Sequence, residues 1–426
     1  MTTPSAADLG TTLPASSGST NPKRAAVLAP TVPVQAARGG EIAAAKLAQQ
    51  SVLPVTLLGI GTAVPAHKIM QTDAAAVSHA MFADRYPEYE RMHAVFTSSG
   101  IVSRYAVKPI EWYQEPRNWA DRTAAYLEGA TALFAAAAAR ALDDAGLKPT
   151  DIDAIVTVSS TGIATPSLEA RYLDALGLGR QTRRVPVFGL GCGGGVAGLS
   201  IAADLARAAP GRTVLLVAVE VCTLSFRLDT LTKSNIVATA LFGDGAGACI
   251  IRADGRATIG QSANGGVLGL GAVPRSSGSA RHRGLAISVT GEHTWPATLD
   301  LMGWNVDPDG FGVVFARAIP PFARTNMGPA MSGILARGGL EIGDIGRFVC
   351  HPGGARVVDA LEQSIGLDAG SLDHERSILA EYGDMSAPTV LFVLERVLAE
   401  ATPSRAAMIA MGPGFTASCA VLEALA

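Results

Sequence analysis

The sequence has few charged and few aromatic residues, and its cysteines are not grouped. Charged residues make up 17% and aromatic residues 5% of the 426 residues, with a net charge of −3. We therefore expect neither nucleic acid nor a membrane surface as a partner. None of the five cysteines forms a C-x-x-C pair, so neither a zinc site nor a disulfide framework is indicated. No apolar run is long enough to span a bilayer, so we expect a cytoplasmic protein with reduced thiols.

Residues 1–53 differ in composition from the rest of the chain. They are rich in Ala, Ser, Thr, Pro and Gly and contain few large apolar residues. The segment lacks the charged start and apolar stretch of a secretory signal, and its few acidic residues only weakly resemble a transit peptide. We therefore expect a disordered or weakly helical extension.

From residue 54 onward, strand-like runs alternate with helical patterns. Residues 154–159 are typical of a buried strand, whereas 118–145 and 355–365 have helical spacing. This alternation predicts an α/β fold with buried, largely parallel strands. Residues 54–265 and 266–426 follow a similar order, each with a reactive residue directly after a strand. This similarity indicates two duplicated halves.

A cysteine framed by glycines, in Gly189-Leu-Gly-Cys192-Gly-Gly194, lies between an apolar run and a helical segment. The N-terminus of a helix would stabilise a thiolate and lower the pKa of Cys192, and the glycines would admit a substrate. A lone buried cysteine is, however, often only a small apolar residue. The same segment also spells G-x-G-x-x-G, and Glu220 closes the next apolar run, as in a dinucleotide-binding site.

Two further residues have suggestive settings. His351 follows an apolar strand and precedes a Pro-Gly-Gly turn, so it is expected to face the crevice where α/β proteins bind ligands. The alternative is that it only caps the turn. Asp384, in Gly383-Asp384-Met-Ser386, precedes a helix, and its alternative role is that of a helix cap.

Together these segments resemble the type III polyketide synthases, the chalcone and stilbene synthase-like family of the thiolase superfamily. The resemblance covers nearly all of residues 54–426. It rests on six segments in the family's order: 57–65, 159–166, 191–192, 240–246, 350–354 and 410–416. It implies a five-layered αβαβα thiolase-like fold, a homodimer, and no metal or organic cofactor. It also argues against the dinucleotide-binding site.

The resemblance implies that acyl-CoA and malonyl-CoA are the substrates. The Cys192 thiolate would attack an acyl-CoA starter and hold the acyl group, and His351 would form an ion pair with the thiolate. Malonyl-CoA would lose CO2, and its enolate would extend the chain before closure to a resorcinol, phloroglucinol or pyrone. Two alternatives remain: a single-condensation β-ketoacyl synthase III-like enzyme, and an acyl-CoA-binding protein that loads Cys192 without extension.

Asp384 departs from the family pattern, which has asparagine at this position. Asparagine donates an N–H group to the thioester oxygen, whereas an ionised carboxylate only accepts. Either burial keeps Asp384 protonated and able to donate through O–H, or the ionised group strengthens the His351 imidazolium and weakens decarboxylation. We expect the protonated acid to take over the donor role.

The resemblance also places residues around the substrate cavity. It implies that Phe242 is a gatekeeper, that Val313 lies near the second gatekeeper position and that Thr165 reaches across the dimer. The full predicted substrate-binding set is Thr161, Thr165, Cys222, Ser225, Phe242, Val313, Ser386, Gly412, Pro413 and Gly414. Ordinary core packing is the alternative for Cys222. Arg91 and Arg104 lie near the segment that contacts CoA phosphates in the family, although the match is poor and a solvated face is the alternative for Arg91.

Overall fold

The computed structural model describes residues 53–253, 284–308 and 310–425. Nearly all of the predicted extension at 1–53, and the predicted boundary between the halves at residue 265, lie outside the described residues. No helix in the described part of the chain is both long enough and apolar enough to cross a membrane.

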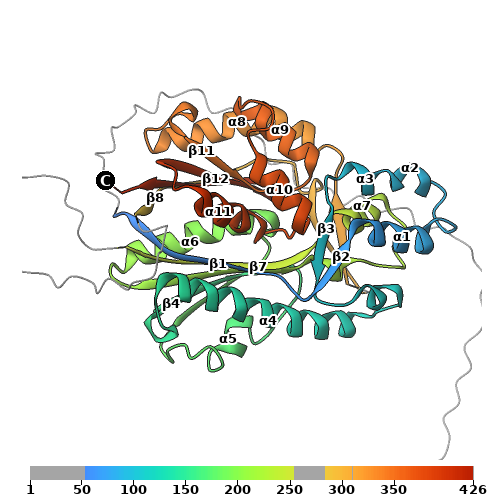
Figure 1. The fold of residues 1–426 in the computed structure, drawn as a ribbon, viewed down its shortest axis with the longest axis horizontal. Coiled ribbons are helices and arrows are strands. Elements are labelled where there is room, and N and C mark those ends of the chain that lie inside the picture. Colours follow the sequence, from blue (N-terminus) through green and yellow to red (C-terminus); the bar gives the residue numbers. More distant parts are fainter. Residues whose placement is uncertain (1–52, 254–283, 309, 426) are drawn as a thin grey trace, which may run out of the picture. The chain divides into compact units, whose positions relative to one another are not determined.

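The described residues form five alternating layers of helices and sheet (Figure 1). Helix α4 (Trp119–Ala145) covers one outer face. Helices α6 (Gly194–Ala208) and α11 (Thr389–Glu400) lie in the middle. Helices α8 (Ile319–Arg337) and α9 (Ala355–Ile365) cover the other outer face. The predicted αβαβα arrangement is therefore confirmed.

One sheet of nine strands forms both sheet layers, in the order β11-β12-β13-β8-β1-β7-β6-β4-β5. Its two parts are joined by β1 and β8, which pair at only two positions. The strands are β1 (Val55–Ala63), β4 (Ala154–Val158), β5 (Arg183–Val187), β6 (Thr213–Val221), β7 (Asp244–Ala253), β8 (Leu285–Thr294), β11 (Arg347–Cys350), β12 (Arg405–Gly412) and β13 (Thr416–Ala424).

The two parts of the sheet repeat one pairing pattern. Strand β4 is parallel to β6, which is antiparallel to β7, which is antiparallel to β1. In the same way, β11 is parallel to β12, which is antiparallel to β13, which is antiparallel to β8. Only the edge strand β5 lacks a counterpart in the described part of the sheet. The repeated pairing agrees with the expected duplication.

The prediction of largely parallel strands is wrong, because most neighbours in this sheet run antiparallel. A parallel connection needs a helix that crosses the face of the sheet. Helix α7 (Lys233–Leu241), which links β6 to β7, packs instead against α1 (Gln71–Phe82) and β10 (Gly310–Phe315). The tight turn Pro413-Gly414-Phe415 makes β12 and β13 a hairpin.

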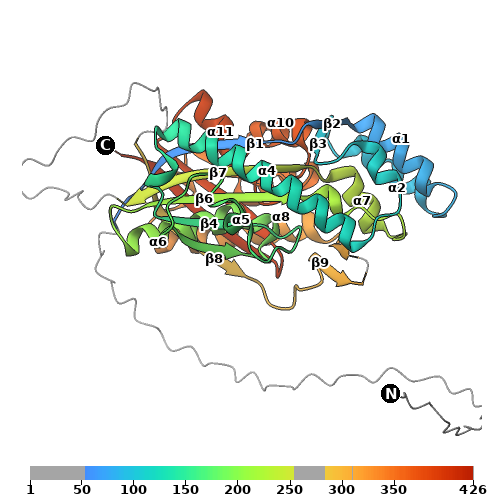
Figure 2. The same cartoon turned by 90° about the horizontal axis from the view of Figure 1, so that it is seen from below.

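Helix α4 shows how the sequence places a helix on the sheet. A capping box formed by Asn118 and Asp121 begins the helix, and Gly146 in the left-handed conformation ends it. Figure 2 shows α4 lying along β1, β7 and β6. A Cβ atom on Gly59 of β1 would lie 2.5 Å from the carbonyl oxygen of Ala141, so glycine is needed for this close approach.

Most of the remaining elements lie near one end of the sheet, whereas α5 packs against α4, β4 and β5. They include α10, which leads to Asp384, and the hairpin of β9 and β10 beside Phe242. Their bounds are β2 (His67–Met70), α2 (Tyr89–His93), α3 (Val95–Ser98), β3 (Ser103–Ala106), α5 (Leu168–Tyr172), β9 (Met302–Asp307) and α10 (Asp373–Tyr382).

Candidate active site

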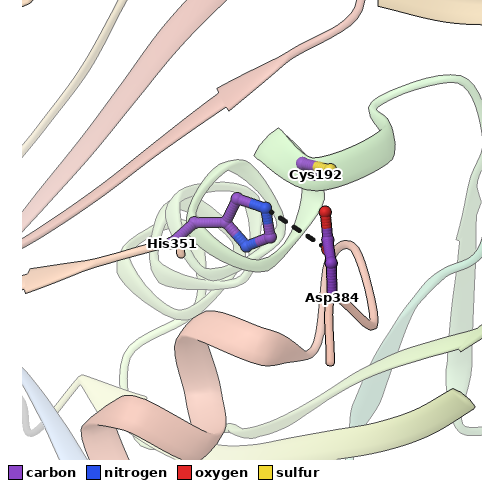
Figure 3. A group of neighbouring side chains, drawn as sticks. All are labelled: Cys192, His351 and Asp384. Carbon is purple, nitrogen blue, oxygen red and sulfur yellow. Dashed lines mark ion pairs between the residues drawn. The ribbon is translucent and has the colours of Figure 1, made fainter. Parts of the chain in front are cut away.

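Cys192, His351 and Asp384 come together from three distant segments (Figure 3). The Cys192 sulfur, one imidazole nitrogen of His351 and one carboxylate oxygen of Asp384 all lie within 4.8 Å of one another. His351 Nε2 is 3.6 Å from Asp384 Oδ1. All three residues are buried. The structure therefore brings a thiol, an imidazole and a carboxyl group together in one place.

Cys192 lies in a single turn, Gly191–Gly193, immediately before α6, as the sequence predicts. Two glycines of this segment are needed for packing in the structure. Gly191 has a φ of 47°, and a Cβ atom there would lie 2.7 Å from the ring of Pro413. A Cβ atom on Gly195 would lie 2.3 Å from the carbonyl oxygen of Ala387. Both glycines therefore allow close packing against segments of the second half.

The pKa of Cys192 is raised well above the usual range, first by burial and then by the Asp384 carboxylate, while a hydrogen bond with Ser386 opposes the rise. Burial also lowers the pKa of His351, with Asp384 acting in the opposite sense. The expected lowering of the Cys192 pKa by the helix N-terminus is therefore wrong for the free protein, because desolvation outweighs it. Both shifts favour the neutral forms, a thiol and an unprotonated imidazole.

The His351 side chain does not cap the Pro-Gly-Gly turn. Among the described residues, neither Nδ1 nor Nε2 has a hydrogen-bond partner, although His351 is only 4% exposed. A buried polar group without a partner is costly, and such groups concentrate at functional sites. Both ring nitrogens are thus available to a substrate.

Asp384 is not a helix cap either, because α11 begins at Thr389 and its N-cap residue is Pro388. Asp384 Oδ1 accepts the Ser386 N–H at 2.8 Å, and Oδ2 has no partner. Burial raises the pKa of Asp384, and the nearby His351 acts in the opposite sense. If the Asp384 side chain keeps its proton, Oδ2 is therefore the oxygen that could donate it in a hydrogen bond.

Backbone contacts fix Asp384 beside Phe242. The Asp384 N–H donates to the Leu241 carbonyl at 2.8 Å, and the Gly243 N–H donates to the Asp384 carbonyl at 2.9 Å. These two bonds form an isolated parallel bridge between Phe242 and Asp384. The gatekeeper predicted from the sequence is thereby tied to the predicted catalytic acid.

Most of the predicted cavity residues line one of two pockets that share Cys222 and Phe242. The first pocket contains Cys192, Cys222, Phe242, Val313, Ser386 and Pro413, together with Trp304 from β9. The second contains Cys222, Ser225 and Phe242 with a set of apolar side chains. Phe242 thus lies between the nucleophile and an apolar chamber.

Four residues of the predicted set lie elsewhere. Thr165 is exposed, after the end of β4. Gly412 packs against Gly193, where a Cβ atom would lie 3.0 Å from the backbone nitrogen, and Gly414 is in the hairpin turn. Thr161 is buried and donates to Glu220 Oε2 at 2.6 Å.

Glu220, which the sequence suggested only as part of a dinucleotide-binding site, has a supporting role in the structure. Its carboxylate accepts the Ser160 N–H at 2.9 Å as well as the Thr161 hydroxyl, and it is fully buried. Ser160 Oγ in turn accepts the N–H groups of Gly189 and Gly191. Burial raises the pKa of Glu220 to about 8. Glu220 therefore supports the turn that carries Cys192, which excludes the dinucleotide-site role.

Arg104 has a structural role that was also missed. Its guanidinium donates to the carbonyls of Thr239, Ala240 and Phe242 at the end of α7, and the residue is buried. It is therefore not available to CoA phosphates, whereas Arg91 is exposed. Only the tertiary contacts reveal that Arg104 supports the Phe242 loop.

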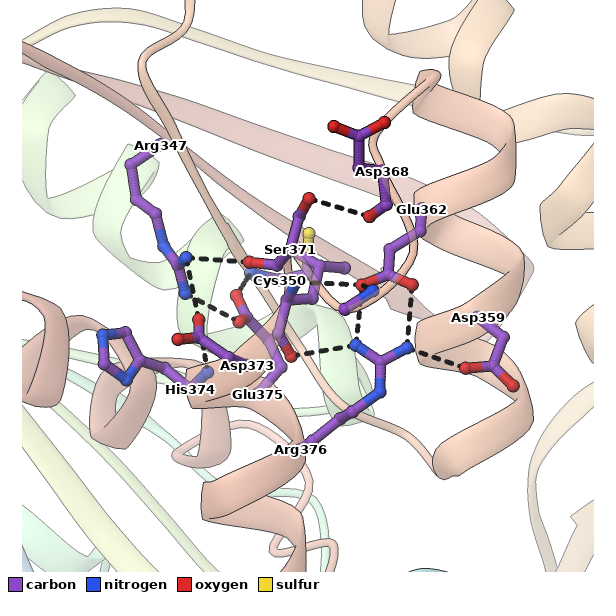
Figure 4. A network of polar contacts seen from close by, with 12 residues as sticks. Arg347, Cys350, Asp359, Glu362, Asp368, Ser371, Asp373, His374, Glu375 and Arg376 are labelled. Carbon is purple, nitrogen blue, oxygen red and sulfur yellow. Dashed lines mark hydrogen bonds and ion pairs between the residues drawn. The ribbon is translucent and has the colours of Figure 1, made fainter.

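A charged network holds the strand end before His351 (Figure 4). Glu375 Oε1 accepts the Cys350 N–H at 2.8 Å, and Arg347 lies 3.0 Å from Oε2 of the same carboxylate. Burial raises the pKa of Glu375 to about 7, and Arg347 opposes the rise. Beside it, Arg376 holds the pKa of Glu362 at about 2. The network fixes the backbone from which His351 projects.

Comparison with known proteins places this site in a family. Residues 42–255 match the N-terminal domain, and residues 287–426 the C-terminal domain, of the chalcone and stilbene synthases. The chain is 35% identical to the 1,3,6,8-tetrahydroxynaphthalene synthase of Streptomyces peucetius subsp. caesius, over 86% of this chain and 93% of that protein. It is 34% identical to a putative chalcone synthase of Bacillus subtilis, over 84% and 96%.

The fold agrees with these matches. The crystal structure of 1,3,6,8-tetrahydroxynaphthalene synthase from Streptomyces coelicolor, described as a bacterial type III polyketide synthase, has a TM-score of 0.77 and 27% identity. The match covers 87% of this chain and 99% of that one. The chain therefore belongs to the chalcone and stilbene synthase family of type III polyketide synthases.

Proposed function

We propose that the protein loads an acyl-CoA starter on Cys192, extends it by decarboxylative condensation with malonyl-CoA and cyclises the product to a resorcinol, phloroglucinol or pyrone. The observation that carries this proposal is the meeting of Cys192, His351 and Asp384 within 4.8 Å beside a pocket. This is the arrangement that covalent acyl transfer requires: a nucleophile, a base in reach and a donor for the carbonyl oxygen.

In the loading step, the Cys192 sulfur would attack the thioester carbonyl while His351 accepts the thiol proton. A neutral imidazole with two unpartnered nitrogens is suited to this task, because burial lowers its pKa and leaves it unprotonated. CoA would leave as a thiol after it receives a proton. The acyl group then remains on Cys192 as a thioester.

In the extension step, malonyl-CoA would lose CO2 and leave an enolate whose oxygen needs hydrogen-bond donors. Among the described residues, both imidazole nitrogens of His351 and Asp384 Oδ2 are polar atoms without a partner at this point. A proton on Oδ2 would make Asp384 a donor, since Oδ1 already accepts from Ser386. The enolate carbon would then attack the Cys192 thioester, the bond to the Cys192 sulfur would break, and the extended chain would remain as a thioester of CoA.

We infer that the starter carries an apolar acyl group. The chamber beyond Phe242 is lined by apolar side chains, including Ile69, Val77 and Ala238. Its hydroxyl groups are bonded within the protein: Ser225 donates to the Cys222 carbonyl, and Tyr113 pairs with Thr223. Arg104 is the charged residue of this lining, and its guanidinium donates to three backbone carbonyls, so the chamber offers mainly apolar contact.

We also propose a homodimer. Strand β5 is the edge of the sheet and pairs only with β4 among the described strands. Ile163 and Phe188, which follow these two neighbouring strands, are 53% and 58% exposed. Thr165 is exposed in the same loop as Ile163. An unpaired edge beside exposed apolar side chains is a surface suited to a second copy.

One observation favours a less complete reaction. Asp384 replaces the donor amide expected from the family resemblance, and an ionised carboxylate would repel the malonyl group and the enolate. A protein with ionised Asp384 would load Cys192 and then stall, or would condense only once.

Product analysis separates these functions. The purified protein receives malonyl-CoA with acyl-CoA starters that range from acetyl to long-chain and aromatic, and Cys192→Ala serves as the control. Products that differ by two-carbon units and are absent from the control would support the polyketide synthase. Acylation of Cys192 in the intact protein without any extended product would support the loading-only alternative.

A further inference from the structure

We propose that the Cys192 thiolate, the His351 imidazole and the Asp384 carboxylate form a three-ligand site for a zinc-class divalent cation, whose binding blocks acylation. Sulfur, nitrogen and oxygen ligands of these types are those that zinc takes in proteins. The cation would act here as an inhibitor and not as a cofactor. The block of acylation rests on the proposed function, whereas cation binding does not.

The geometry suits a tetrahedral cation. When nitrogen and oxygen ligands lie about 2.0–2.2 Å from zinc, tetrahedral angles place them about 3.3–3.5 Å apart. His351 Nε2 and Asp384 Oδ1 are already 3.6 Å apart. The third ligand atom, the Cys192 sulfur, belongs to the same group within 4.8 Å. Side-chain movement of about one ångström completes the site.

His351 and one oxygen of Asp384 also lack competing partners. Among the described residues, neither imidazole nitrogen of His351 nor Asp384 Oδ2 has a hydrogen bond, and both residues are buried. Asp384 Oδ1 and the Cys192 thiol each have one bond, to Ser386, which a cation would have to compete with. Unpaired buried polar atoms cost free energy, which a bound cation would recover. Both side chains and Cys192 line one small pocket, which leaves the fourth position for water or another small ligand.

Charge makes Asp384 decisive for this site. A divalent cation with one thiolate and one carboxylate forms a neutral group, which a buried position tolerates. With asparagine in place of Asp384, the same cation would retain a net positive charge in a buried pocket. The residue that departs from the family pattern is thus the one that completes the metal ligand set.

The binding test uses metal-free full-length protein and no substrate. Cobalt(II) is the probe, because it reports a tetrahedral site with a thiolate ligand through its absorption spectrum, and zinc affinity is then measured against a chromophoric chelator. Asp384→Asn is the matched variant, since it keeps both other ligands and the shape of the side chain. Cys222→Ala is the control, because Cys222 lines the neighbouring pocket and is the alternative thiol.

We expect the wild-type protein to bind one cobalt ion per chain and to show a thiolate-to-cobalt absorption band. The affinity for zinc should fall more than about 100-fold in Asp384→Asn and stay unchanged in Cys222→Ala. Absence of the band, equal affinity in Asp384→Asn, or loss of binding in Cys222→Ala would overturn the site.

A second measurement tests the block. Zinc should protect Cys192 from alkylation by iodoacetamide in the wild-type protein, and much less in Asp384→Asn. Equal alkylation with and without saturating zinc would overturn the block. Because neither measurement uses CoA substrates, failure of the proposed function would leave both results unaffected.

Discussion

His351 Nε2 lies 3.6 Å from Asp384 Oδ1, in a buried site where neither side chain forms a salt bridge with any other described residue. Burial lowers the pKa of the histidine and raises the pKa of the aspartic acid, so it drives both toward their neutral forms. A neutral imidazole is a base, and a neutral carboxylic acid is a hydrogen-bond donor. The pair can therefore serve the two steps that a condensing enzyme needs.

Replacement of His351 by alanine should slow acylation of Cys192 by about 10²–10⁴-fold, because the thiol loses its general base. Intact-protein mass spectrometry after mixing with acyl-CoA measures this rate. His374→Ala is the control, since that histidine pairs with Glu400. Acylation at the wild-type rate in His351→Ala would refute the assignment of the base.

The apolar chamber predicts a selective effect of Ala238→Phe. The larger side chain fills space beyond Phe242, so long-chain starters should lose at least tenfold in kcat/KM while acetyl-CoA is little affected. Steady-state rates with a series of acyl-CoA chain lengths check this. An equal loss of kcat/KM for all starters would indicate that the substitution damages the enzyme in general. No loss for any starter would show that the acyl group does not enter this chamber.

Arg104→Gln should destabilise the protein by about 2–3 kcal/mol, because it leaves buried carbonyls of the Phe242 loop without donors. Denaturant unfolding measures the difference. The matched control is Arg91→Gln, at an exposed position, for which we expect less than about 0.5 kcal/mol. Equal effects of the two changes would contradict the role of Arg104.

Glu220 predicts a pH dependence of stability. Its pKa rises from 4.5 to about 8 on folding, so between these values the folded protein holds a proton that the unfolded chain has lost. The free energy of unfolding should therefore fall as pH rises through this window. Glu220→Gln, which resembles the protonated acid, should reduce that slope. The free energy of unfolding is measured at pH 5.5 and 8 in the wild-type protein, in Glu220→Gln and in the control Glu111→Gln, at an exposed position. A pH slope in Glu220→Gln equal to that of the wild type would contradict the role of Glu220.

The sequence predicted the local elements and the chemistry-bearing residues well. The apolar strand predicted before His351 is β11, and helix 355–365 matches α9, because the apolar run, the Gly-Gly turn and the helical periodicity are all local. Cys192 and His351 could be identified for the same reason. The resemblance added Asp384, whose contact with His351 no local pattern reveals.

The missed features depend on tertiary contacts. Strand β7 runs antiparallel to β6 because α7, which connects them, packs away from the face of the sheet. No local sequence pattern encodes that packing. The roles of Arg104 and Glu220 arise from partners more than fifty residues away. The raised pKa of Cys192 follows from burial, which outweighs the helix terminus that the sequence shows.

The central claim is that protonated Asp384 donates to the thioester oxygen during decarboxylation. It is tested most directly by the pH dependence of malonyl-CoA decarboxylation in the wild-type protein and in Asp384→Asn. Because the wild-type site must keep a proton that the amide does not need, its activity should fall with rising pH at lower values than in Asp384→Asn. Coincident pH profiles would contradict the claim.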